Sequence, residues 1–151
     1  VERIGGLDIE RVYETGGLKF HTCDTVLIRR NVFRHMRGAP GVWLDYLNRN
    51  VRVTENVLAD IEGILGAIYI EVSHALNVVD HNVVWDVRGT EKTGSGKGIN
   101  VDTGERCIVT HNLLGRVCDE YAISVHLEQQ ERVVGGRGQC NAHGAGLSLD
   151  R

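Results

Sequence analysis

This chain of 151 residues contains little proline, few aromatic residues and only a small excess of charge of one sign. It contains one proline, 5% aromatic residues and a formal net charge of −3. So small a net charge argues against a strongly basic nucleic-acid-binding surface and gives no reason to expect an anionic membrane partner. No apolar run approaches the roughly 18 residues that a membrane helix needs. We therefore expect neither a nucleic acid nor a membrane as a partner.

A signal peptide and cysteine motifs are also missing. The first residues, VERIGGLDIE, do not combine a basic stretch with an apolar core. The cysteines lack CxxC or finger-like spacing and are expected to be buried or idle thiols of a reducing compartment: Cys23, Cys107, Cys118 and Cys140. These features predict a cytoplasmic protein. Because the chain does not begin with Met, we expect it to be part of a longer protein.

The sequence does contain an internal repeat. Four segments place an Asn after a β-rich stretch, at steps of 25, 26 and 30 residues: VLIRRNVF (26–33), VRVTENVL (51–58), NVVDHNVV (77–84) and CIVTHNLL (107–114). We expect the repeated Asn31, Asn56, Asn82 and Asn112 to form an internal amide ladder at a bend. His81 and His111, which precede two of these Asn residues, are interpreted as turn residues.

A second segment repeats in phase with the first and alternates apolar and polar residues, as strands do: GLKFH (17–21), GVWLD (41–45), AIYIE (67–71), GINVD (98–102), AISVH (122–126) and GLSLD (146–150). Two strands per coil and no helical periodicity predict an all-β, right-handed parallel β-helix of about five to six coils. We expect a single domain over residues 1–151, with an irregular segment at 131–146. Its two ends are expected to be uncapped, as in a truncated solenoid.

Strand alternation sorts the second set of segments into columns. The inward columns are Leu18, Val42, Ile68, Ile99, Ile123, Leu147 and Phe20, Leu44, Ile70, Val101, Val125, Leu149. The first outward column is Lys19, Trp43, Tyr69, Asn100, Ser124, Ser148, and the second is His21, Asp45, Glu71, Asp102, His126, Asp150. Every member of the second outward column is ionisable. Stacked carboxylates repel, so this column indicates chemistry rather than a plain solvated face.

Asp45 and Glu71 are the pair of this column whose alignment on adjacent coils is most secure, because each lies 11 residues before its ladder Asn. His21 and Asp102 lie 10 before theirs, which requires a one-residue slip in the turn. Strands about 4.8 Å apart would bring the two carboxylates within the roughly 5–5.5 Å that retaining glycosidases use. Two close carboxylates also favour a retained proton on one of them. Trp43 and Tyr69 are expected to provide an apolar wall and a platform for a sugar ring.

The strings GLKFH, GVWLDY, AIYIEVSHA and INVDTGERCIVTHNLL resemble the β-helix of glycoside hydrolase family 120, whose members are β-xylosidases. The resemblance covers roughly residues 14–115. It implies a retaining hydrolase of xylo-oligosaccharides, with Asp45 as nucleophile, Glu71 as acid/base and no cofactor. It also implies a companion β-sandwich domain outside this chain; a homo-oligomer is the other assembly expected. Further candidates for binding sugar hydroxyls or tuning the carboxylates are Lys19, His21, His74, Asp102 and His126.

Two alternatives stay open at this point. One is a polysaccharide lyase or epimerase with a β-helix fold, for which calcium held by stacked carboxylates would be a typical aid. The other is a non-catalytic solenoid that binds carbohydrate. A single flat column of ligands spans too far for one ion, so we predict no metal site.

Overall fold

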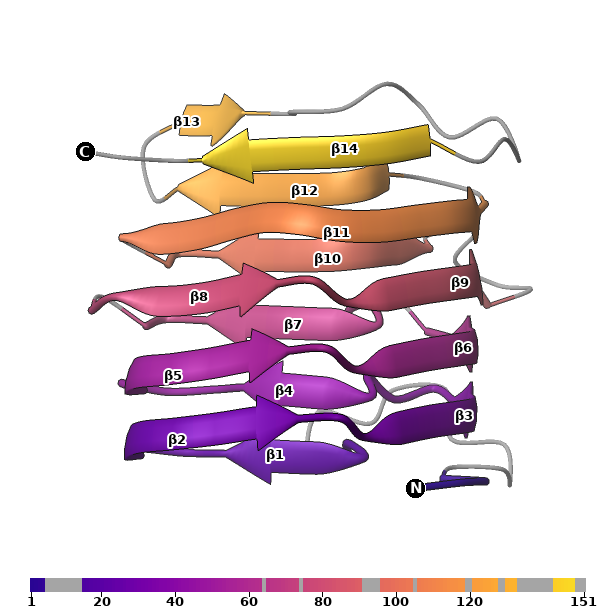
Figure 1. The fold of residues 1–151 in the computed structure, drawn as a ribbon, viewed down its shortest axis with the longest axis horizontal. Coiled ribbons are helices and arrows are strands. Elements are labelled where there is room, and N and C mark those ends of the chain that lie inside the picture. The colour runs from indigo at the N-terminus through magenta and orange to yellow at the C-terminus, as the bar shows by residue number, and fades with distance from the viewer. Residues whose placement is uncertain are drawn as a thin grey trace.

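The computed structural model describes residues 1–4, 15–63, 65–73, 75–90, 96–104, 106–118, 121–127, 130–132 and 143–148. Within these ranges all regular structure is β-strand, and the backbone winds into a right-handed parallel β-helix (Figure 1). The described residues make about four turns. They contain no helix long and apolar enough to cross a membrane.

One sheet consists of the short strands that carry the ionisable column. Its order is β1 (Leu18–Phe20), β4 (Val42–Leu44), β7 (Ile68–Glu71), β10 (Lys97–Asp102), β12 (Tyr121–Leu127) and β13 (Gln130–Arg132). The pairs from β1 to β12 are parallel and in the predicted register, whereas β13 pairs antiparallel with β12. This sheet is the one that positions the candidate site.

In the facing sheet each coil contributes two strands, one on either side of a bend. Its strands are β2 (Asp24–Arg29), β3 (Val32–Arg37), β5 (Arg49–Thr54), β6 (Val57–Glu62), β8 (Asn77–Asp80), β9 (Val83–Arg88), β11 (Cys107–Val117) and β14 (His143–Ser148). The first strand of each pair stacks on the next coil's first strand, and likewise for the second. β11 runs through the bend as one strand and pairs with both β8 and β9.

The core lies between the two sheets and confirms the predicted inward columns in the middle of the stack. The members Val42, Ile68, Ile99 and Ile123, and Leu44, Ile70, Val101 and Val125, are all buried. Leu18 and Phe20, on the first coil, are partly buried and pack against this cluster. Burial of branched apolar side chains from successive coils is the main stabilising contribution in such a stack.

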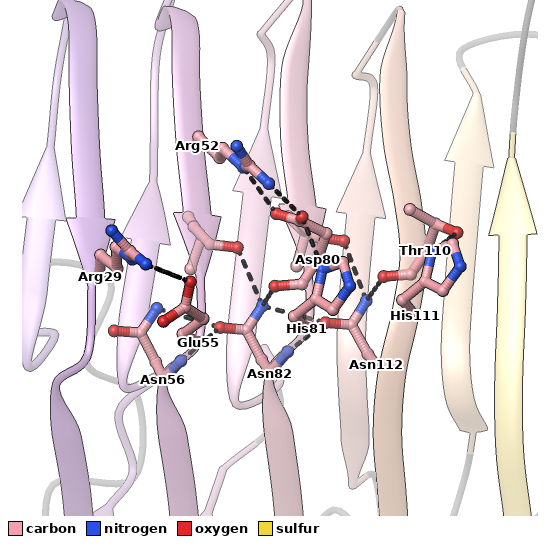
Figure 2. Close-up of polar contacts among 12 residues, drawn as sticks. Arg29, Arg52, Glu55, Asn56, Asp80, His81, Asn82, Thr110, His111 and Asn112 are labelled. Atoms are coloured by element: carbon pink, nitrogen blue, oxygen red, sulfur yellow. Dashed lines mark hydrogen bonds and ion pairs between the residues drawn. The ribbon is translucent and has the colours of Figure 1, made fainter.

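The predicted amide ladder is confirmed and lies at the bend (Figure 2). Asn56 donates from Nδ2 to the Oδ1 of Asn82 at 3.0 Å, and Asn82 donates to Asn112 in the same way at 2.9 Å. Asn31 donates to Asn56 at 3.0 Å. The residue before each ladder Asn has a left-handed backbone, with φ between 52° and 57°: Arg30, Glu55, His81 and His111. This repeated conformation turns each coil by the same amount.

The C-terminal part differs from the prediction of a sixth parallel strand. β14 runs antiparallel to β11, so Leu147 lies opposite Val109 and Ser148 opposite Ile108. Leu147 and Ser148 therefore belong to neither predicted column, while Leu149 and Asp150 lie outside the described residues. Within the expected irregular segment 131–146, β13 ends at Arg132 and β14 begins at His143. An antiparallel strand at this place covers the open edge of the last long strand.

Candidate active site

Strand register assembles the first outward column of the short-stranded sheet. Lys19 pairs with Trp43, Trp43 with Tyr69, and Tyr69 with Asn100, which pairs with Ser124. Trp43 and Tyr69 are each only 3% exposed, and their ring centroids lie 5.5 Å apart. So little exposure leaves almost no ring surface for stacking on a sugar. The two aromatic side chains instead form an apolar wall beside the carboxylates.

The second outward column brings Asp45, Glu71 and Asp102 onto adjacent coils. Asp45 follows Leu44, whose partner in β7 is the residue before Glu71. Glu71 pairs directly with Asp102. The structure thus places Asp45 and Glu71 side by side, as the sequence predicts, with Asp102 one coil further along.

The two carboxyl groups have different surroundings. Lys19 Nζ lies 3.0 Å from Asp45 Oδ2, and both side chains are about one-fifth exposed. The pKa of Glu71 is raised, chiefly because partial burial disfavours its charge and secondarily because the Asp45 carboxylate lies beside it. Trp43 opposes this rise by donating its indole N–H to Glu71 Oε2 at 3.1 Å. The surroundings of Glu71 therefore favour its protonated form.

Asp102 links the pair to two further side chains. The Tyr69 hydroxyl donates to Asp102 Oδ2 at 3.2 Å, and the pKa of Tyr69 is raised by burial and by the charges of Asp102 and Glu71. On the next coil, His126 Nδ1 lies 2.9 Å from Asp102 Oδ1, and His126 is exposed. A continuous polar chain thus runs from Lys19 to His126, across the neighbouring strands β1, β4, β7, β10 and β12.

His21 does not join this chain among the described residues. Its ring lies 5.4 Å from that of Tyr46. Tyr46 is the one residue by which the turn after β4 is longer than the turn after β1. The Lys19 ammonium lies over the Trp43 ring at 3.7 Å as well as on Asp45, where it can tune that carboxylate; its contact with sugar hydroxyls stays a prediction. His74 lies outside the described residues.

The equal 11-residue offsets of Asp45 and Glu71 have two different origins. The turn after each short strand contains a residue with positive φ: Thr22, Leu47, Val72 and Thr103. In the second coil the extra residue, Tyr46, precedes this turn residue. In the third coil the extra residue lies between Val72 and Asn77, because Asn77 pairs with Val51. The pairing predicted from the equal offsets is confirmed, although equal offsets alone do not locate the insertions.

Sequence reasoning missed the indole N–H of Trp43 as a partner of Glu71. It also missed a polar ladder at the turn behind the site, where Asn48 Oδ1 accepts from the backbone N–H of Cys23 at 3.1 Å. Ser73 contributes to the same turn, because its hydroxyl lies 3.3 Å from both the Asn48 N–H and the Asp45 carbonyl. The in-phase positions of Cys23, Asn48 and Ser73, at steps of 25 residues, were the available signal.

Comparison with known families adds an independent finding. A family model described as "Periplasmic copper-binding protein (NosD)" matches residues 3–135. The chain belongs to the NosD family. A search of curated proteins gives no match, and a search of solved structures gives none either. Membership of the NosD family agrees with the β-helix and does not distinguish glycoside hydrolase family 120.

The NosD description also bears on the expected compartment. It names a periplasmic family, which argues against the cytoplasmic prediction. Cys118 is in a disulfide, which contradicts the expectation of an idle thiol and is typical of an oxidising compartment. Cys23 and Cys107 are free cysteines, as expected.

The described residues do not build the kind of centre that the family's copper description would suggest. No group of three or more His, Cys, Asp or Glu side chains in that part of the chain is arranged to hold a metal ion. The ionisable column is dominated by carboxylates, whereas copper prefers imidazole and sulfur ligands. We therefore derive no chemistry of the candidate active site through copper.

Proposed function

We propose that this NosD-family chain carries the catalytic carboxylates of a retaining glycoside hydrolase, with Asp45 as the nucleophile and Glu71 as the acid/base. The observation that carries the proposal is the adjacent-coil pair itself. Asp45 is held beside the Lys19 ammonium, while burial and the Asp45 charge raise the pKa of Glu71. A retaining mechanism needs one ionised carboxylate and one protonated carboxyl group at short separation.

The reaction proceeds in two steps. Ionised Asp45 attacks the anomeric carbon, the glycosidic C–O bond breaks, and Glu71 gives its proton to the leaving oxygen. Glu71, now a carboxylate, then takes a proton from water as that water attacks the anomeric carbon and releases Asp45. Lys19 and Trp43 hold the two carboxyl groups in place through the ion pair and the indole hydrogen bond. The sugar leaves with its anomeric configuration retained.

The proposed substrates are xylo-oligosaccharides. This choice rests on the resemblance of WLDY and IEVSH, which contain Asp45 and Glu71, to the β-xylosidases of glycoside hydrolase family 120. Asp102 and His126 are the proposed contacts for sugar hydroxyls, because their side chains are more exposed than those of Lys19 and Asp45. Their side chains are 34% and 54% exposed. The fold family itself leaves the sugar open, since one fold hosts many functions.

The test compares Asp45→Asn and Glu71→Gln in the full-length protein on an aryl xyloside. We expect Asp45→Asn to lower kcat/KM by about a thousandfold or more. Glu71→Gln should retain more turnover of an aryl group that leaves without protonation. Added azide should accelerate that variant and give a product of retained configuration, because azide needs no general base. Asp24→Asn, which removes an exposed carboxylate paired with Arg49, is the matched control and should leave kcat/KM unchanged.

The other function classes give different results in the same assays. An unsaturated product that absorbs in the ultraviolet would indicate a lyase. Sugar binding that survives in both variants, with no turnover by the parent protein, would indicate a carbohydrate-binding module. Proton NMR of the first product decides the stereochemistry, and an inverted product would overturn the roles given to Asp45 and Glu71.

A further inference from the structure

The turn after β4 contains one residue, Tyr46, that neither neighbouring coil has. Asp45 and Tyr46 together separate Leu44 from the left-handed turn residue Leu47. On each neighbouring coil a single residue occupies the corresponding place: His21 between Phe20 and Thr22, and Glu71 between Ile70 and Val72. An extra residue on one strand that faces a single residue on the next is a β-bulge. The bulge lies directly beside the proposed nucleophile.

Backbone hydrogen bonds locate this bulge. The Asp45 N–H donates to the Phe20 carbonyl at 2.9 Å, and the Thr22 N–H donates to the Tyr46 carbonyl at 2.7 Å. His21 therefore lies opposite both Asp45 and Tyr46. Strict alternation would turn the side chain after Asp45 inward, but a bulge redirects it. The Tyr46 side chain accordingly points outward and is 43% exposed.

Tyr46 and His21 form a pair of exposed rings next to Asp45. Their centroids are 5.4 Å apart and their planes differ by 30°. His21 is exposed as well. Within the part of the chain that the structure describes, neither the Tyr46 hydroxyl nor a His21 ring nitrogen has a hydrogen-bond partner. Both rings thus keep a face and a polar group available to a ligand.

The other aromatic side chains beside the carboxylates are already occupied. Trp43 and Tyr69 are each 3% exposed. The Trp43 indole donates to Glu71, and the Tyr69 hydroxyl donates to Asp102. An aromatic ring binds a sugar through its open face, with its polar atom at the rim. Tyr46 meets this requirement, whereas Trp43 and Tyr69 do not.

We propose that Tyr46, backed by His21, is the platform that binds the transferred pyranose sugar. The proposal rests on the proposed hydrolase function and gives the substrate a direction. Glu71 protonates the leaving oxygen, so the leaving group lies toward β7 and β10. Asp45 bonds to the anomeric carbon from the β4 side, next to Tyr46 and β1. The sugar that stays on Asp45 therefore lies over the Tyr46 ring.

The kinetic test compares Tyr46→Ala and Tyr46→Phe in the full-length protein on two aryl xylosides with different leaving groups. We expect Tyr46→Ala to raise KM by about tenfold for both substrates and to change kcat by less than about twofold. The reason is that stacking holds the transferred sugar equally in the ground state and the transition state. Inhibition by free xylose should weaken by the same factor. Tyr46→Phe keeps the ring and should behave like the parent protein.

Binding of xylobiose, measured by NMR titration, gives a readout that needs no turnover. Its affinity should fall by about tenfold in Tyr46→Ala and stay near the parent value in Tyr46→Phe. Trp85→Ala is the matched control, because it removes a ring that is 37% exposed on β9 of the facing sheet. This variant should leave KM and xylobiose affinity unchanged. Circular dichroism melts of all variants check the fold.

The outcomes separate this proposal from the proposed function. Hydrolysis by the parent protein, with KM and xylose inhibition unchanged in Tyr46→Ala, overturns the platform and leaves the hydrolase proposal standing. Xylobiose binding that depends on Tyr46, without hydrolysis by the parent protein, supports the platform and overturns the hydrolase proposal. A KM that rises for only one leaving group, or equal losses in Trp85→Ala, would also overturn the place given to Tyr46.

Discussion

At the scale of single residues, the candidate site depends on how Glu71 is held. Burial and the Asp45 charge raise its pKa, while the indole N–H of Trp43 stabilises the carboxylate form and limits the rise. Trp43 itself is 3% exposed and lies under the Lys19 ammonium. One buried indole thus donates to Glu71 and lies under the ammonium that pairs with Asp45, although its residue type suggested only an apolar wall and a sugar platform.

Replacing Trp43 by Phe should change the pH dependence of the proposed reaction. The variant loses the hydrogen bond that lowers the pKa of Glu71, so this pKa should rise further. A general acid works only while protonated, and the alkaline limb of kcat/KM should therefore move to higher pH. Trp85→Phe, on the partly exposed β9 side chain, should leave the limb in place. An alkaline limb that moves to lower pH in Trp43→Phe would contradict this account.

At the scale of elements, the amide ladder connects the coils at the bend. Asn82 is 1% exposed, and its Oδ1 accepts from both the backbone N–H and the Nδ2 of Asn56, each at 3.0 Å. Its own Nδ2 donates to the Val53 carbonyl at 2.9 Å. Removing such a side chain leaves buried donors and an acceptor without partners, which costs more than the lost hydrogen bonds alone.

Asn82→Ala should lower the free energy of unfolding by roughly 3 kcal/mol. Asn31→Ala is the control at the first ladder position. Its side chain donates to Asn56 Oδ1 but is not an acceptor in the described ladder, so its loss should cost only about 1 kcal/mol. Urea denaturation followed by circular dichroism measures both values. Equal losses in the two variants would show that the ladder does not act as a connected unit.

At the scale of the whole molecule, one terminal strand of the long sheet is covered at each end of the stack: β3 by residues 1–4 and β11 by β14. Residues 1–4 bond along β3, with the Arg34 N–H donating to the Val1 carbonyl at 3.0 Å and the Arg37 N–H to the Ile4 carbonyl at 2.9 Å. At the other end, β14 pairs antiparallel along β11. Covered edges limit strand addition by other chains, which is the usual hazard of an open sheet.

Removing residues 143–151 should therefore lower the thermal midpoint and promote self-association, because the N–H and C=O groups of β11 lose their partners in β14. Light scattering after size-exclusion chromatography measures the mass, and calorimetry measures the midpoint. A chain that ends after residue 148 keeps β14 and should behave like the parent. Unchanged mass and midpoint in the shorter chain would indicate that the edge needs no cover.

The sequence by itself determined the β-helix, the inward columns, the Asn ladder and the neighbouring placement of Asp45 and Glu71. These follow from alternation within a strand and from repetition once per coil, both of which can be counted along the chain. Lys19, Trp43 and Tyr69 were placed on the correct face by the same rule. Their contacts were not predictable, because alternation says which way a side chain points and not what covers it.

Only the tertiary structure decided where the extra residues lie and which way the last strand runs. An offset counted from Asp45 or Glu71 to a ladder Asn is a sum over a whole turn, so it cannot locate an insertion within that turn. Parallel and antiparallel strands share the same two-residue period, and GLSLD therefore carries no direction of its own. The backbone hydrogen bonds between coils settle both points, because they join residues that lie a full repeat or more apart in the sequence.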